Sequence, residues 1–209
     1  YPMMKIHEDG FFEVIIEDRQ EWFRYQLSLT DYEGNQWTTY DAYSFAPTIS
    51  EYDRYLFGAG NHYKIFEKLG AHIMTVDGVE GVSFGVWAPN AKAVSVIGNF
   101  NSWDGRRNQM RVLGESGIWE LFVPGLKEYD QYKYQIKDKY NNVCDKADPY
   151  ASFAQLRPDT ASVIYDNSRY VWGDKAWTDD RNSEHIYQGP INIYEVHFGS
   201  WMRVPEEGN

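Results

Sequence analysis

The chain has 209 residues, a formal net charge of -11 at pH 7 and one cysteine, Cys144. The negative charge disfavours a nucleic acid or an anionic membrane surface as a partner, whereas a neutral polysaccharide requires no charge match. One cysteine forms no internal disulfide, and the sequence has neither a secretory signal nor an apolar run of about 18 residues, so we expect a cytoplasmic protein.

Residues 11 to 45 have the composition and spacing of β-strands. Phe23, Tyr25 and Leu27 alternate with polar neighbours, which is the period of two of a half-buried strand. The strand-like runs are "FFEVIIE", "FRYQLSLTD" and "WTTYDAYSF", and "YEGNQ" supplies turn residues between the last two. We therefore expect a small β-module at the start of the chain.

Two short helices are predicted next in the chain. Ser50 is a suitable N-cap for a helix over Glu51 to Phe57, with Gly58 and Gly60 ending it. Asn61 is a suitable N-cap for a second helix through Leu69, which Gly70 would end.

From about Gly78 to Asp166, short strand-like runs follow one another at intervals of roughly ten residues, with Gly and Pro between them. This pattern predicts a β-sandwich. The stretch from Tyr170 is polar and irregular, and "INIYEVHFGSW", Ile191 to Trp201, is typical of a buried strand. Because a single strand cannot form a domain, we expect the chain to be a piece of a longer protein.

Single residues in the sandwich region also carry predictions. Trp87 and Trp119 alternate with polar neighbours and are interpreted as packing residues. Cys144 is interpreted as a small filler without reactivity. Arg106 follows Asp104 closely enough to form an ion pair that fixes the turn between them.

Five segments stand in the order found in 1,4-α-glucan (glycogen) branching enzymes, and the chain resembles this family from roughly Leu56 to Trp201. The segments are "GVWAPNAKAVSVIGNFNSWDGRRNQM", "GIWELFVPGL", "YKYQI", "KADPYA" with "RPDTASV", and "INIYEVHFGSW". The resemblance implies a mainly β chain whose central part is an immunoglobulin-like β-sandwich of carbohydrate-binding module family 48. The implied divisions are a partial N-terminal β-sandwich module at 1–55, a helical linker at 56–77, the carbohydrate-binding module at 78–168, a connector at 169–189 and the start of a (β/α)8 barrel of glycoside hydrolase family 13 at 190–209.

The activity that the resemblance implies for the parent protein is retaining transfer of α-1,4-glucan chains, which forms the α-1,6 branches of glycogen. Such a site requires two carboxyl groups about 5 Å apart. In the family these groups lie on later strands of the barrel, beyond Asn209. We therefore expect no catalytic residue, cofactor or metal site in this chain. Its expected partners are an α-glucan (glycogen or a malto-oligosaccharide) and its own catalytic barrel.

The resemblance also implies a carbohydrate-binding surface on the sandwich. In sugar-binding members, the tryptophan of the "FNxW" turn stacks on glucose and the lysine of the "YKY" strand bonds hydroxyls, and Trp103 and Lys133 match these positions. The following hairpin has no second tryptophan, so Tyr140 is the candidate to replace it, and Ala161 stands where an asparagine is expected. Two interpretations stay open: Trp103 is either an exposed platform for sugar or a core residue of a module that has become a spacer.

Two other classes of protein are consistent with a module of this kind. One is a stand-alone glucan-binding or scaffold module, against which the strand-like "YEVHFGSW" argues because a free module has no use for it. The other is the N-terminal part of a debranching or trehalose-forming enzyme, which shares the order of module and barrel but usually lacks "WDGRRNQM" combined with "KADPYA" and "RPDTAS".

Overall fold

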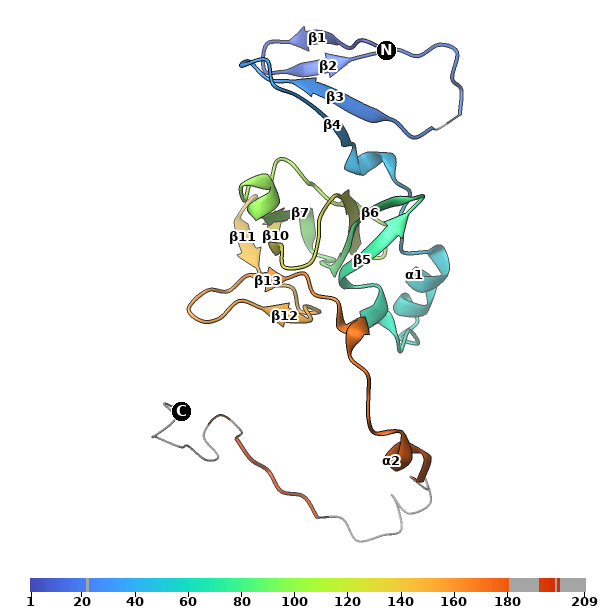
Figure 1. The fold of residues 1–209 in the computed structure, drawn as a ribbon, viewed down its shortest axis with the longest axis vertical. Helices are drawn as coiled ribbons and strands as arrows, with labels where there is room; N and C mark the ends of the chain where they lie inside the picture. The colour runs from blue at the N-terminus through green and yellow to red at the C-terminus, as the bar shows by residue number, and fades with distance from the viewer. Residues whose placement is uncertain (22, 181–191, 198, 200–209) are drawn as a thin grey trace. The chain divides into compact units, whose positions relative to one another are not determined.

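The structure is a computed structural model that describes residues 1–21, 23–180, 192–197 and 199. The chain divides into two units, residues 1–167 and 168–209 (Figure 1).

The first unit begins with two antiparallel hairpins. Strand β1 (Met4–His7) pairs with β2 (Phe11–Glu13), and β3 (Gln26–Thr30) pairs with β4 (Gln36–Tyr40). The predicted turn between β3 and β4 is confirmed, and the Asp31 carboxylate accepts hydrogen bonds from the backbone N–H groups of Glu33 and Asn35 there. The first and second predicted strands are shorter than expected, since Val14 to Tyr25 contain no strand among their described residues.

The first predicted helix is confirmed as α1 (Glu51–Gly58). The Ser50 hydroxyl accepts from the Asp53 N–H at 3.1 Å, and the Asp53 carboxylate accepts from the Ser50 N–H at 2.9 Å, which is a complete capping box. A short 3-10 helix, η1 (Ala42–Ser44), precedes it.

The second predicted helix is wrong. Only a 3-10 turn, η2 (Ile65–Glu67), forms in this stretch. The Asn61 N–H bonds to the Leu56 carbonyl at 2.9 Å and so closes the end of α1 instead of opening a new helix. Strand β5 (Gly70–Val76) then occupies the second part of the range interpreted as a helical linker.

The predicted β-sandwich is confirmed. One sheet has the order β5-β6-β9-β8, formed with β6 (Val79–Trp87), β9 (Ile118–Pro124) and β8 (Arg111–Val112). In the other sheet, β10 (Gln131–Asp138) pairs with β7 (Ala91–Gly98) and also with β11 (Val143–Lys146) and β13 (Ser162–Val163); β13 continues to β12 (Phe153–Ala154). Val82, Phe84 and Leu121 from the first sheet meet Val96 and Tyr134 from the second in the main core.

The segment that contains η1, α1 and η2 covers the outer face of the four-stranded sheet. The Phe45 and Phe122 rings lie 4.8 Å apart in an edge-to-face contact. Glu120 is fully buried on this face, where its carboxylate pairs with the Arg111 Nε at 3.0 Å and accepts from the Thr48 N–H at 3.2 Å. Strand β9 is therefore buried on both sides. On the outer face of the other sheet, Ser95 and Ile97 of β7 are buried, whereas Lys133 and Gln135 of β10 are partly exposed.

A buried carboxyl group lies at the edge of the core. The hydroxyls of Tyr132 and Tyr134 donate to Asp148 Oδ2 at 2.6 and 3.2 Å, and Asp148 Oδ1 accepts from the Tyr150 N–H at 2.8 Å. Burial raises the pKa of Asp148, and the tyrosine hydrogen bonds counteract part of that increase.

The second unit contains helix α2 (Lys175–Asp180). Residues 192–197 form neither helix nor strand, so the strand predicted at Ile191–Trp201 is not confirmed, and its remaining positions apart from Gly199 lie outside the described residues. Within the part of the chain that the structure describes, no helix is both long and apolar enough to cross a membrane.

Candidate functional site

The turn that follows β7 is held by one buried amide side chain. Asn101 Oδ1 accepts from the Gly98 N–H at 2.9 Å, and its Nδ2 donates to the Val96 carbonyl at 3.0 Å and to Asn108 Oδ1 at 2.8 Å. These three bonds join both ends of the turn, so its backbone is fixed rather than free to adapt.

Trp103 is presented to solvent by this turn. The residue is 39% exposed, and both Ser102 and Trp103 have φ of 59°, the left-handed region that bulky residues rarely adopt. The Trp103 N–H bonds to the Gly98 carbonyl at 2.8 Å, which closes the turn. The turn therefore holds the Trp103 ring partly exposed at the surface, in a backbone conformation that is uncommon for a bulky residue.

Lys133 lies on the outer face of the five-stranded sheet, where it is partly exposed. Tyr132 and Tyr134 point into the core, so Lys133 and Gln135 between and beyond them face outward. The Lys133 ammonium donates to Thr160 Oγ1 at 2.8 Å. Thr160 is the neighbour of Ala161, and it supplies a polar group beside the position where an asparagine was expected.

Tyr140 lies at the far end of β10, in the turn that leads to β11. It is 72% exposed, and the Lys139 ammonium lies 5.0 Å from the centre of its ring. The next residue, Asn141, has its side-chain oxygen 3.0 Å from the Lys92 ammonium. This end of the sheet therefore combines an aromatic ring with amide and ammonium donors.

The structure brings two of the three candidate residues to the same end of one sheet. Gly98, which bonds to Trp103, is paired with Tyr132, the neighbour of Lys133. Tyr140 is separated from Lys133 by a strand length of roughly 17 Å. A ligand that contacts all three residues must therefore extend along β10, past the Gln135 amide that bonds to Asp145 at 3.1 Å.

Electrostatic interactions further fix the turn. Arg106 bonds the Asp104 carboxylate through Nε and Nη2 at 2.9 and 2.7 Å, and these bonds lower the pKa of Asp104. The Arg107 Nε lies 4.0 Å from the same carboxylate. The predicted ion pair is confirmed: the Asp104 carboxylate is bound by an arginine side chain of its own turn.

Two of the other single-residue predictions are wrong. Cys144 is exposed on β11, so it is not a filler. Trp87 is 54% exposed and contacts Phe57 edge-to-face, whereas Trp119 is buried as predicted and its Nε1 donates to the Ala88 carbonyl at 3.0 Å. Trp87 is the last residue of β6 and stays half-exposed although Phe57 of α1 packs against it.

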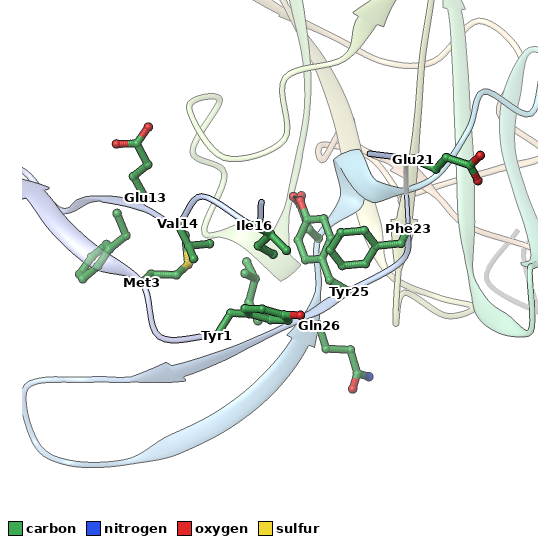
Figure 2. Close-up of a pocket in the computed structure, with 12 residues that line it drawn as sticks. Tyr1, Met3, Glu13, Val14, Ile16, Glu21, Phe23, Tyr25 and Gln26 are labelled. Atoms are coloured by element: carbon green, nitrogen blue, oxygen red, sulfur yellow. Dashed lines mark hydrogen bonds between the residues drawn. The ribbon is translucent and has the colours of Figure 1, made fainter. Parts of the chain in front are cut away.

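A groove of about 620 Å³ lies among the N-terminal hairpins, apart from the candidate sugar site. Figure 2 shows Met3, Val14 and Ile16 on one side of it and Phe23 and Tyr25 on another. The Tyr25 hydroxyl donates to Asp41 at 2.5 Å, and this bond, with burial, raises the pKa of Tyr25 to about 12. The residues that line the groove are mainly apolar, as in a hydrophobic core that is not completely covered.

Sequence reasoning did not identify Asn101 or Thr160. The signal for Asn101 was the short spacing of Asn101 to Gly98, which permits a side chain to cap its own turn. Thr160 could be found only from the pairing of β10 with β13. Among the described residues, no group of three or more His, Cys, Asp or Glu side chains could hold a metal ion.

Two protein-family models match parts of the chain. "Carbohydrate-binding module 48 (Isoamylase N-terminal domain)" matches residues 68–151, and "alpha-1,4-glucan branching enzyme GlgB, N-terminal domain" matches residues 1–43. The first match begins before residue 78, so it includes β5, in agreement with the sheet order.

Curated relatives match almost the whole chain. A 1,4-alpha-glucan branching enzyme GlgB of Thermosynechococcus vestitus is 48% identical over 99% of this chain and 27% of its own length. The protein of the same name from Trichodesmium erythraeum is 45% identical over 98% of this chain and 26% of its own length. The chain therefore spans about a quarter of the length of these relatives.

Solved structures resemble the chain at lower sequence identity than these relatives do. A pullulanase from Bacillus acidopullulyticus is 28% identical with a TM-score of 0.39, over 47% of this chain and 12% of that chain. The pullulanase type I of Bacillus subtilis, in complex with maltose, is 26% identical with a TM-score of 0.41, over 50% and 14%. The sequence relatives carry the comparison: over nearly all of its length this chain is similar to 1,4-alpha-glucan branching enzymes GlgB, and its first 43 residues match the N-terminal domain of that family.

Proposed function

We propose that this chain is the non-catalytic N-terminal part of a cytoplasmic enzyme that forms α-1,6 branches in glycogen. The observation that carries the proposal is 48% identity to a branching enzyme over 99% of the chain. The transfer itself requires the catalytic Asp and Glu of the barrel, which lie beyond Asn209 in this proposal.

Within this function, the outer face of β10, beside the turn that carries Trp103, holds the glucan. Trp103 supplies a flat apolar surface for one face of a glucose ring, and Lys133 supplies donors for its hydroxyls. Tyr140 contacts the same glucan farther along β10. An open surface with one or two rings buries little of the ligand, so each contact is weak and the benefit comes from keeping a long polymer near the barrel.

Trp103→Ala tests the binding site. We expect NMR line shifts on titration of the parent chain with millimolar maltoheptaose and loss of those shifts in the variant, with little change in melting temperature. Trp87→Ala is the matched control, because Trp87 is similarly exposed but lies on the other sheet. A parent chain without any response, or a Trp103→Ala variant that unfolds, would reduce the module to a spacer.

Activity is tested on the full-length parent protein and on residues 1–209 side by side. With amylose as substrate, we expect the full-length protein to lower iodine absorbance without a matching rise in reducing ends, and residues 1–209 to cause no change. Loss of iodine absorbance by residues 1–209 alone would refute the non-catalytic assignment. Hydrolysis of existing α-1,6 links by the full-length protein would instead indicate a debranching enzyme.

A further inference from the structure

The segment that covers the four-stranded sheet presents aromatic side chains on its outward side. Tyr52 and Tyr55 of α1 are 67% and 69% exposed, and Tyr63 and Phe66 around η2 are 86% and 57% exposed. We call these four residues the aromatic face. Exposed rings gathered within one segment cost free energy in water unless another surface covers them.

The opposite side of the same segment is firmly anchored. Phe57 and Ile65 pack against a buried cluster formed by Ile49, Leu69, Leu113 and Ile118. Tyr52 and Tyr55 are three positions apart on α1 and their rings stack at 6.5 Å, whereas Phe57 lies on the other side of the helix. The exposed rings therefore cannot turn inward without breaking this packing.

A polar cluster joins α1 to the turn that follows it. Asp53 accepts from the Ser50 N–H, its Oδ1 lies 3.0 Å from His62 Nε2, and its Oδ2 lies 3.5 Å from the Lys68 ammonium. Burial opposes ionisation of Asp53, but the hydrogen bonds from Ser50 and His62 and the charge of Lys68 lower its pKa overall. The cluster keeps the two halves of the aromatic face in a fixed relation, which reduces the entropy cost of docking.

We propose that the aromatic face is the surface on which the remaining, catalytic part of the parent protein docks. This inference rests on the proposed function. About three quarters of the length of the relatives lies outside the part that this chain matches, so a large body of the same polypeptide is available to cover it. Tyrosine and phenylalanine are the residue types enriched where such interfaces are fully buried.

The position of the face on the sandwich fits this assignment. Figure 1 shows α1 on the side of β5 and β6, and β10, β11 and β13 on the other side. Docking through α1 and η2 therefore leaves the outer surface with Trp103 and Lys133 open to glucan. The module is two-sided, with one sheet directed to the catalytic body and the other to the polymer.

Amide hydrogen exchange tests the proposal on the full-length parent and on residues 1–209. We expect peptides from 51–67 to exchange at least about tenfold more slowly in the full-length protein. Equal exchange in the two proteins would overturn the proposal. Protection that appears only with maltoheptaose, or that rises with the concentration of residues 1–209, would overturn it in favour of a glucan or a second copy.

Substitutions supply the second measurement. We expect Tyr63→Ser with Phe66→Ser to lower the melting temperature of the full-length protein but not that of residues 1–209. The control, Tyr32→Ser with Leu156→Ser, removes two side chains that are more exposed than Tyr63 and Phe66, and it should change neither melting temperature. An equal loss in residues 1–209 would mean that Tyr63 and Phe66 only stabilise the module.

Branching activity, measured on the same full-length protein, separates the two proposals. An active protein with unprotected 51–67 contradicts only the docking surface. An inactive protein with protected 51–67 contradicts the proposed function and keeps the docking surface.

Discussion

At the scale of single residues, the turn that carries Trp103 depends on the absence of a side chain at Gly98. A Cβ there would lie 2.1 Å from the Gln131 carbonyl oxygen and 2.4 Å from the Phe100 ring. The backbone of Gly98 is extended, so the requirement is close approach and not an unusual φ. The turn can cross next to β10 only because glycine leaves this space.

We predict that Gly98→Ala destabilises the chain by about 2 kcal/mol, because a backbone atom of a paired strand must move. Gly105→Ala is the matched comparison, since its Cβ would approach the flexible end of Gln135, which can move away. Urea unfolding of the two variants measures the difference. Equal midpoints would show that the turn adapts to a methyl group and is not held rigidly.

The buried Asp148 gives a prediction about pH. Because its pKa is raised, the folded chain retains a proton that the unfolded chain has lost above about pH 4. The free energy of unfolding then decreases as the pH rises toward the pKa of the folded state, by linkage. We expect Asp148→Asn to lack this contribution, so its stability relative to the parent should improve as pH rises. Parallel curves of unfolding free energy against pH for the two proteins would contradict this prediction.

At the scale of elements, α1 shows what local sequence can determine. Ser50 and Asp53 specify the capping box through side chains within one turn, and the helix forms as predicted. The stretch from Asn61 carries a similar cap but forms no α-helix, because its backbone ends α1 and His62 turns back to Asp53. A cap signal is therefore ambiguous when the same residues can serve the preceding helix.

Ser50→Ala should reduce stability by about 1 kcal/mol, because the Asp53 N–H loses its acceptor. Ser50→Thr retains the hydroxyl and is expected to restore most of the loss. Thermal unfolding of the three chains provides the measurement. A loss shared by both variants would place the cost in packing around Ser50 instead of in the cap.

The candidate site could be predicted only in part, because some of its residues are brought together by strand pairing and not by local sequence. Trp103 and Lys133 belong to recognisable local runs, and the structure places Lys133 on the outward side of β10, between the buried Tyr132 and Tyr134. Thr160 is 27 residues from Lys133, and only the pairing of β10 with β13 brings them near each other. The exposure of Trp87 beside α1 and of Cys144 on the edge strand β11 likewise depends on tertiary packing, which no local pattern records.

At the scale of the whole molecule, the first unit has parts of very different burial. Strands β6 and β9 are buried along most of their length, with another layer on each side. Strands β1 and β2 are exposed at every residue, and β3 and β4 are exposed at most of theirs. The apolar groove of Figure 2 lies in this second part, where side chains that would form a core remain open.

This contrast predicts unequal stability along the chain. Two-stranded hairpins are marginally stable without a covered face, whereas opening β6 or β9 requires disruption of the main core. In residues 1–209, we expect amides of β1 to β4 to exchange at rates close to those of an unfolded peptide and amides of β6, β9 and β10 to exchange only on global unfolding. Denaturant should therefore leave exchange in the hairpins almost unchanged while it accelerates exchange in the sandwich. Comparable protection throughout, with the same dependence on denaturant, would mean that the hairpins and the sandwich unfold as one cooperative body despite the open groove.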